Sequence, residues 1–272
     1  MKKSLVLVAI LLARAVFAEE ENQTGFRVIQ ERSDDGVTLI MKSDYCVEFT
    51  VTLEATLKNM TSSKPVPFTV DAAGRSSFVL ARFNRTDKSQ PWRYNYYYHW
   101  EYGGRRDSTD NDADYAMPFK PGRRYVVMQG PRGSFSHFAG SGSENAVDWD
   151  VPEGTTICAA RDGRVVGVRD DSTVSGTDPK FKPLGNYVII KHADGTFADY
   201  HHLKTDGALV KVGDQVTTGQ PIGLSGATGF ASKPHLHFMV FQAIDGKKVL
   251  SLPFRLKTDH GIFTEFIRGK SY

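Results

Sequence analysis

The stretch Pro234-His235-Leu236-His237-Phe238-Met239-Val240-Phe241-Gln242 decides how the second half of this chain is expected to fold. The apolar residues from Leu236 to Gln242 are typical of a buried strand. In a strand, residues i and i+2 face the same side, so the two imidazoles of His235 and His237 should project side by side. They could form part of a metal or catalytic site, although two unrelated histidines in an alternating pattern would look the same.

The region around this strand, from Tyr125 to about residue 245, also has a β pattern. Its apolar runs are short, as in Tyr187–His192. Glycine-containing turns such as Asp162-Gly163 and Asp194-Gly195 separate them at close spacing. We therefore predict a compact all-β domain.

The first half of the chain also has the pattern of strands. Val47–Leu53 alternates with period two, Phe78–Phe83 does so less regularly, and Arg93–Glu101 is rich in Tyr and Trp. Helical periodicity is absent, so this half is predicted to be a small β-sandwich. Its tyrosine run, Tyr94–Tyr98, could be a glycan-stacking face or a half-buried face of the sheet.

The amino terminus has the three parts of a secretory signal peptide. Lys2 and Lys3 are positive, Leu5–Leu12 is apolar, and Val16-Phe17-Ala18 resembles a cleavage site. The apolar run is too short to span a bilayer, and no later stretch is long enough. We expect an exported protein, periplasmic or extracellular, without stable membrane insertion.

The expected organisation has five parts. They are a signal peptide at 1–18, a flexible leader at 19–35, a β-sandwich accessory domain at 36–118, a second β-domain at 119–245 and a carboxy-terminal extension at 246–272.

The overall charge argues against a nucleic-acid partner. Lys and Arg number 34 against 31 Asp and Glu, giving a net charge of +3, whereas nucleic-acid-binding domains are strongly basic. The two cysteines, Cys46 and Cys158, lie in different predicted domains. An exported protein permits a disulfide, but buried free thiols fit the apolar surroundings of Cys158.

Two further segments could complete a site with the histidine pair. Asp148 lies in the apolar stretch Ala146–Pro152, and a carboxylate buried there needs a partner. Another imidazole follows an alternating strand in Asp199-Tyr200-His201-His202-Leu203. A shell of two histidines and one aspartate with an open position suits a catalytic zinc ion.

These segments belong to a longer series of motifs that resembles a known family. The series includes Ala146-Val147-Asp148, Pro152-Glu153-Gly154-Thr155, Ala159-Ala160-Arg161-Asp162-Gly163, Tyr200-His201-His202-Leu203, Gly219-Gln220-Pro221-Ile222-Gly223 and Pro234-His235-Leu236-His237-Phe238. Between Phe135 and Gln242 the chain resembles the M23 metallopeptidases, the lysostaphin and LytM-type endopeptidases that cut peptidoglycan cross-bridges. The resemblance implies an antiparallel β-sheet peptidase domain.

It also implies roles for individual residues. Asp148 and His237 would be zinc ligands, and His202 and His235 would act as base and as stabilisers of the tetrahedral intermediate. In the family, the first zinc ligand is usually a His four residues before the Asp. In this chain, Glu144 occupies that position. A variant group with a preceding β-domain has Ser/Thr-His upstream instead, so His137 in Phe135-Ser136-His137 is the expected ligand. Glu144 is the alternative, and a decayed metal site is a third possibility.

Three functions therefore stay open at the level of the sequence. The first is a secreted zinc metalloendopeptidase that cleaves peptidoglycan cross-links. The second is a metal-free binding or regulatory module of cell-wall hydrolases, suggested by Glu144. The third is a peptidase that acts on other secreted proteins.

Overall fold

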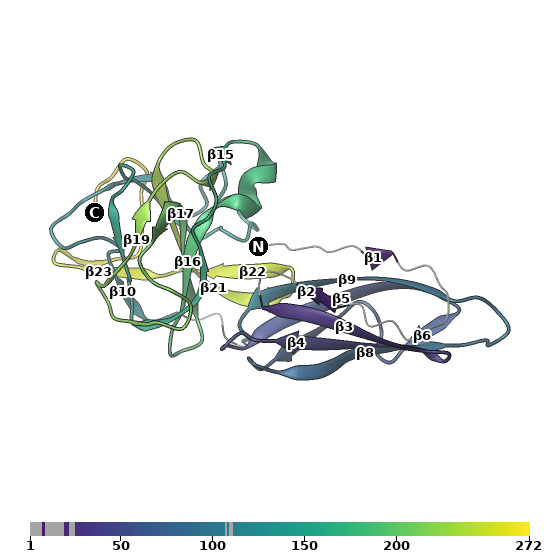
Figure 1. Ribbon diagram of the computed structural model, residues 1–272. Helices are drawn as coiled ribbons and strands as arrows, with labels where there is room; N and C mark the ends of the chain where they lie inside the picture. Colours follow the sequence, from purple (N-terminus) through teal and green to yellow (C-terminus); the bar gives the residue numbers. More distant parts are fainter. Residues whose placement is uncertain (1–6, 9–18, 22–24, 107, 109–110) are drawn as a thin grey trace. The chain divides into compact units, whose positions relative to one another are not determined.

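Strands make up nearly all of the regular structure in the computed structural model, which confirms the all-β prediction (Figure 1). The structure describes residues 7–8, 19–21, 25–106, 108 and 111–272. The signal-peptide prediction for residues 1–18 therefore falls almost wholly outside the described residues. In the part of the chain that is described, we find no helix with the length and apolar character needed to cross a membrane.

The chain divides into two units, Met1–Arg105 with Ala243–Lys248, and Arg106–Gln242 with Val249–Tyr272. The first unit contains two sheets. One has the strand order β1 (Leu7–Val8), β9 (Arg93–Tyr102), β5 (Phe49–Lys58) and β7 (Phe68–Ala72). The other has the order β2 (Glu19–Glu21), β3 (Phe26–Ser33), β4 (Gly36–Ser43), β8 (Ser77–Arg85) and β6 (Met60–Ser62).

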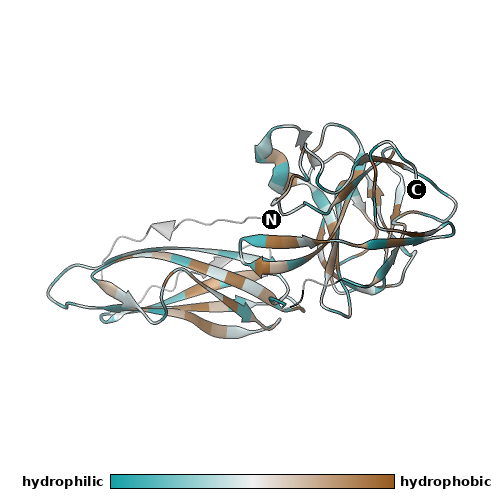
Figure 2. Cartoon of the chain, turned by 180° about the vertical axis from the view of Figure 1, so that it is seen from behind, coloured by the Kyte–Doolittle hydropathy of each residue, from teal (hydrophilic) through white to brown (hydrophobic). Residues whose placement is uncertain are grey.

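The two sheets pack face to face through aromatic side chains. The ring of Phe26 on β3 lies 4.3 Å from that of Trp100 on β9, centroid to centroid. Alternate residues of the long strands are apolar, as the brown and pale bands of Figure 2 show. Tyr94, Tyr96 and Tyr98 face inward and are each 3% exposed. The tyrosine run is therefore sandwich core, and these three rings are not a glycan-stacking face.

The second unit is built on one large sheet. Its main path is β11 (Val126–Gln129), β12 (Val147–Asp150), β21 (His235–Asp245), β17 (Phe197–Ala208), β16 (Asn186–Lys191), β14 (Gly163–Arg169) and β18 (Gln215–Val216). β13 (Thr156–Cys158), β19 (Pro221–Ser225) and β22 (Lys248–Leu252) join beside this path. The neighbouring strands on it pair antiparallel.

Smaller elements flank this sheet. β10 (Asp114–Ala116), β23 (Arg255–Thr258) and β24 (Gly261–Phe263) form a three-stranded sheet. β15 (Ser175–Gly176) pairs with β20 (Gly229–Phe230), and the 3-10 helix η1 (Pro179–Leu184) packs beside them.

Across the large sheet, residues directly opposite one another on neighbouring strands form rows. One row is apolar and lies in the core, and the next row is polar. Val147, Phe238 and Tyr200 lie directly opposite one another on β12, β21 and β17, and all three are buried in the core. The next row along runs from β11 to β17 and consists of Gln129, Asp148, His237 and His201. Because side chains directly opposite one another share a face of the sheet, this second row collects polar groups on the other face.

The unit boundaries differ from those expected. Phe26–Ser33 is strand β3 and not part of a flexible leader, because Phe26 and Val28 alternate into the sandwich core. Tyr115, which the sequence placed in the sandwich, is buried in the core of the second unit.

The residues after 245 are not an appended extension either. Leu252, Phe254 and Leu256 pack in the core of the second unit, and β23 pairs with β10. Cys46 is half-buried and Cys158 is buried, and both are free thiols.

Candidate active site

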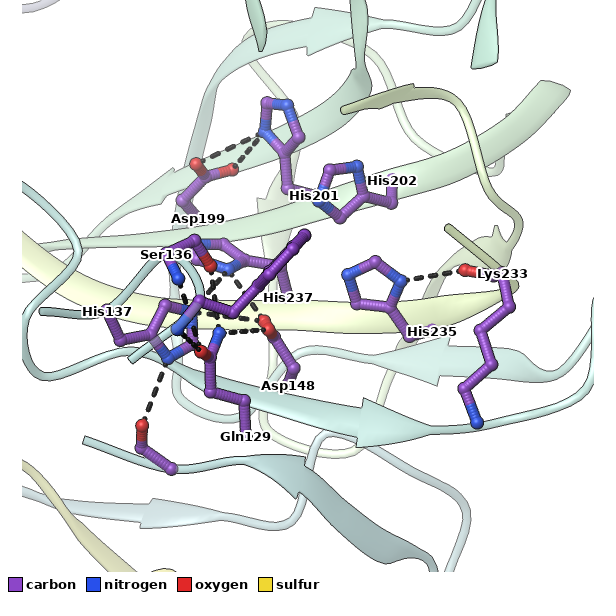
Figure 3. Close-up of polar contacts among 12 residues, drawn as sticks. Gln129, Ser136, His137, Asp148, Asp199, His201, His202, Lys233, His235 and His237 are labelled. Carbon is purple, nitrogen blue, oxygen red and sulfur yellow. Dashed lines mark hydrogen bonds and ion pairs between the residues drawn. The ribbon is translucent and has the colours of Figure 1, made fainter. Parts of the chain in front are cut away.

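His137, Asp148 and His237 bring their side chains together on the polar face of the large sheet (Figure 3). Asp148 Oδ1 lies 2.8 Å from His237 Nδ1 and 3.3 Å from His137 Nε2. The two imidazole nitrogens, His137 Nε2 and His237 Nδ1, are 3.3 Å apart. Three atoms of the kind that bind transition metals thus form a small triangle.

The orientation of His137 is set by the backbone. Its Nδ1 lies 3.1 Å from the carbonyl oxygen of Gly130. A carbonyl oxygen only accepts hydrogen bonds, so Nδ1 carries the proton, and in the neutral ring Nε2 presents a lone pair to the triangle.

The triangle has dimensions that fit a zinc ion. Tetrahedral ligands at zinc–ligand distances of about 2.0–2.2 Å are separated by roughly 3.3 Å. Two of the three separations are 3.3 Å, and the third, between Asp148 Oδ1 and His237 Nδ1, is shorter at 2.8 Å. His137 and Asp148 are buried, whereas the His237 side chain is 13% exposed, so the cluster is accessible from the His237 side.

The carboxylate of Asp148 is stabilised in its charged form. Burial alone would raise its pKa, but the hydrogen bonds and charges of His137 and His237 outweigh burial and hold the pKa well below its ordinary value. A buried anion between two imidazoles is an environment suited to a cation.

His202 and His235 form a second pair beside the triangle. Their ring centroids are 4.4 Å apart, and the His202 ring lies 5.9 Å from that of His237. His202 Nδ1 is 2.7 Å from the Thr228 carbonyl oxygen, and His235 Nδ1 is 2.9 Å from that of Lys233. Each Nδ1 therefore carries a proton, which leaves each Nε2 as the acceptor of a neutral ring.

Burial keeps both rings of this pair neutral. It lowers the pKa of His202 well below the ordinary histidine value, and the neighbouring histidines lower it further. Burial also lowers the pKa of His235. Neutral imidazoles with a fixed tautomer are suited to accept a proton.

A β-bulge brings His202 to the site. Asn186 pairs with Leu203 and Tyr187 pairs with His201, so His202 is an extra residue in β17 without an opposite partner on β16. Its φ of +64° lies in the left-handed region. The bulge places the His202 ring next to that of His201, although regular alternation along a strand would put the two rings on opposite faces of the sheet.

The same bulge determines where the neighbouring His201 points. Regular alternation predicts that its ring points away from His202, but the two ring centroids lie 4.9 Å apart. His201 stacks on Tyr187 and its Nδ1 contacts Asp199 at 3.3 Å. A bulge depends on the register with the neighbouring strand, and no signal in β17 alone reveals it.

Glu144 is held outside the cluster. Its carboxylate binds the Arg132 guanidinium at 3.0 Å and accepts the Gly140 N–H at 2.8 Å. Glu144 was the alternative zinc ligand expected from the sequence, but its carboxylate is engaged by Arg132 and Gly140.

Gln129 is a residue of the site that sequence reasoning missed. Its side-chain amide donates to Asp148 Oδ2 at 3.0 Å. No local pattern points to a glutamine in this role, because its partner lies 19 residues away.

Comparison with known families gives a match in the second half of the chain. The model of Peptidase family M23 matches residues 142–250, a segment that includes Asp148, His202, His235 and His237. Residues 142–250 are therefore similar to the peptidase domain of family M23, as the motifs predicted. The members of this class are metal-dependent peptidases. His137 lies outside the matched segment, just before its first residue.

Relatives with named activities match the same part of the chain. The peptidoglycan DD-endopeptidase ShyA of Vibrio cholerae is 39% identical over 94 residues, which cover 35% of this chain and 19% of that protein. The glycyl-glycine endopeptidase ALE-1 of Staphylococcus capitis is 31% identical over 131 residues, which cover 48% of this chain and 31% of that protein. The chain thus spans less than a third of the length of either relative.

Among solved structures, the catalytic domain of lysostaphin from Staphylococcus simulans is similar to this chain. The two are 28% identical, with a TM-score of 0.33, and the match covers 47% of this chain and 87% of that domain.

Proposed function

We propose that this protein is a zinc-dependent endopeptidase that hydrolyses peptide bonds in peptidoglycan cross-links. The observation that carries the proposal is the convergence of His137 Nε2, Asp148 Oδ1 and His237 Nδ1 beside two neutral histidines. His137, Asp148 and His237 would hold the metal. When bound, zinc polarises a carbonyl group and lowers the pKa of water towards neutrality.

The chain's own residues account for the proton transfers of hydrolysis. The oxygen of water adds to the peptide carbonyl carbon, and a neutral imidazole Nε2, of His202 or His235, takes the proton that the water loses. The same N–H can then donate a hydrogen bond to the oxyanion of the tetrahedral intermediate. When the carbon–nitrogen bond breaks, the leaving amine takes up the proton.

The tautomers of the two rings support this role. Their Nδ1–H groups are fixed on the carbonyls of Thr228 and Lys233, so neither ring can turn its Nε2 away without losing a buried hydrogen bond. The site therefore needs little reorganisation for proton transfer.

The choice of peptidoglycan rests on the relatives. ShyA is named a peptidoglycan DD-endopeptidase, and ALE-1 a glycyl-glycine endopeptidase. Both names describe endopeptidases, and the name of ShyA specifies peptidoglycan as its substrate.

The test is digestion of purified peptidoglycan sacculi. The expected result is that the wild-type protein contains about one zinc ion per chain and releases soluble fragments, and that His235→Ala retains zinc but loses activity. A pentaglycine peptide and an elastin-like protein, assayed in parallel, distinguish cell-wall cross-links from secreted proteins as substrate. A wild-type protein that binds no zinc and cleaves none of these would overturn the proposal in favour of a metal-free binding module.

We also propose that the protein is exported and that the β-sandwich is an accessory domain of the peptidase. Export rests on the signal-peptide pattern of residues 1–18. Amino-terminal sequencing of the mature protein tests it, and a mature chain that begins at Met1 contradicts it.

A further inference from the structure

Gln129 bridges one candidate metal ligand and the loop that carries another (Figure 3). It is the last residue of β11, it is 8% exposed, and it lies directly opposite Asp148 in the sheet. A register shift between Val127 and Gln129 gives it this position. The glutamine side chain therefore projects onto the same face as the carboxylate.

The two ends of the amide have different partners. Gln129 Oε1 accepts the backbone N–H groups of Phe135 and Ser136 at 2.9 and 3.2 Å. Gln129 Nε2 donates to Asp148 Oδ2 at 3.0 Å and to Ser136 Oγ at 2.8 Å. Because backbone N–H groups only donate and a carboxylate only accepts, the orientation of the amide is fixed by its partners.

The bond to Asp148 determines which carboxylate oxygen faces the histidines. Oδ2 is occupied by Gln129, whereas Oδ1 lies 2.8 Å from His237 Nδ1. Without the glutamine, the carboxylate could rotate and present either oxygen. The Nε2–H group thus restrains Asp148 in the orientation that completes the triangle.

The bonds to Phe135 and Ser136 restrain the loop immediately before His137. The loop passes so close to the glutamine that a Cβ at Gly133 would lie 2.3 Å from Gln129 Cγ. Glycine at this position lets the loop close over the side chain. One amide group therefore restrains both candidate ligands. Its Oε1 holds the loop before His137, and its Nε2 holds the Asp148 carboxylate.

We propose that Gln129 is a positioning residue that aligns His137 and Asp148 and thereby sets the affinity of the site for its metal ion. The inference rests on the proposed function, because it assumes that these residues bind zinc. Hydrogen-bond partners of metal ligands typically change affinity by about 10–100-fold when they are removed.

The experiment measures the zinc dissociation constant of the full chain by competition with a chromophoric chelator at pH 7.5. Gln129→Met keeps the length of the side chain and removes all four hydrogen bonds. We expect it to weaken zinc binding at least tenfold. Gln220→Met is the matched control, because among the described residues the Gln220 side chain accepts a hydrogen bond only from Thr217 N–H, in a turn before β19.

The outcomes separate this inference from the proposed function. A wild-type protein that binds zinc, with a Gln129→Met change of less than tenfold in a folded protein, overturns the positioning role alone. A wild-type protein without zinc affinity counts against the metal site itself and so removes the basis of the inference. If Gln129→Met does not fold, Gln129→Asn, which is smaller and too short to bridge both partners, is subject to the same tenfold criterion.

Discussion

His202 and His235 face each other with ring centroids 4.4 Å apart, and each ring is fixed through its Nδ1 on a backbone carbonyl. Neither belongs to the triangle of His137, Asp148 and His237. This separation predicts that the pair contributes to turnover but not to metal binding.

Replacing either ring should therefore reduce activity without loss of zinc. For His202→Ala and His235→Ala we expect a decrease in kcat of about 10²–10⁴-fold, the usual contribution of a general acid or base. Zinc content and turnover on sacculi are the measurements. His260→Ala, at an exposed position near the carboxy terminus, is the control. Loss of zinc in His235→Ala would show that this residue is a ligand instead.

The backbone at His202 allows a second test that separates the bulge from the chemistry. A side chain at φ +64° is strained, and glycine relieves this strain by about 1 kcal/mol. His202→Gly and His202→Ala both lack the imidazole, so both should be inactive. However, His202→Gly should have the larger free energy of unfolding, by about 1 kcal/mol in urea denaturation. Equal stability of the two variants would contradict the bulge geometry.

The sequence predicted the fold class and most members of the site because both leave local signals. Alternating apolar residues define the strands, and the spacing of His235 and His237 follows from the geometry of a single strand. The motifs that resemble family M23 also include Asp148 and His202. These residues are recognisable without knowing which strands are neighbours.

The parts that the sequence did not reveal depend on contacts between distant segments. Gln129 acquires a role only because β11 lies beside β12 with a shifted register. The position of His201 depends on a bulge that is defined relative to β16. Phe26–Ser33 looked like a polar leader because five of its eight residues are polar or charged. Periodicity in one segment cannot report its pairing with another.

Removal of the metal should destabilise the second unit. A ligand that binds only the folded state stabilises it by about 2.7 kcal/mol when its free concentration is 100 times Kd. Zinc should therefore raise the free energy of unfolding of the chelator-treated protein by about this amount, as measured by urea denaturation. Asp148→Asn should lose most of this increment because it lacks the buried anion.

Glu144→Gln provides the matched control for that experiment. The Glu144 carboxylate is engaged by Arg132 and the Gly140 N–H, so its replacement should leave zinc-dependent stabilisation intact. If Glu144→Gln abolished the increment while His137→Ala retained it, Glu144 would be the first ligand.

His192 should make stability depend on pH independently of the site. Its ring is buried, its Nδ1 donates to the Asp162 carbonyl oxygen at 2.8 Å, and burial lowers its pKa from 6.5 to about 4. The unfolded chain therefore binds a proton between pH 6.5 and 4 that the folded chain does not bind. The contribution of His192 to the free energy of unfolding is therefore largest above pH 6.5 and decreases as the pH falls towards 4.

The expected loss between pH 7.5 and pH 5 is about 2 kcal/mol. Urea denaturation of the metal-free protein at both pH values measures it, with chelator present so that metal binding does not contribute. His192→Gln cannot titrate and retains a donor for the Asp162 carbonyl, so its stability should fall by about 2 kcal/mol less over the same range. Other titrating groups contribute equally to both proteins, and the difference between them isolates His192. If the two proteins show the same pH dependence, His192 is not held neutral by burial.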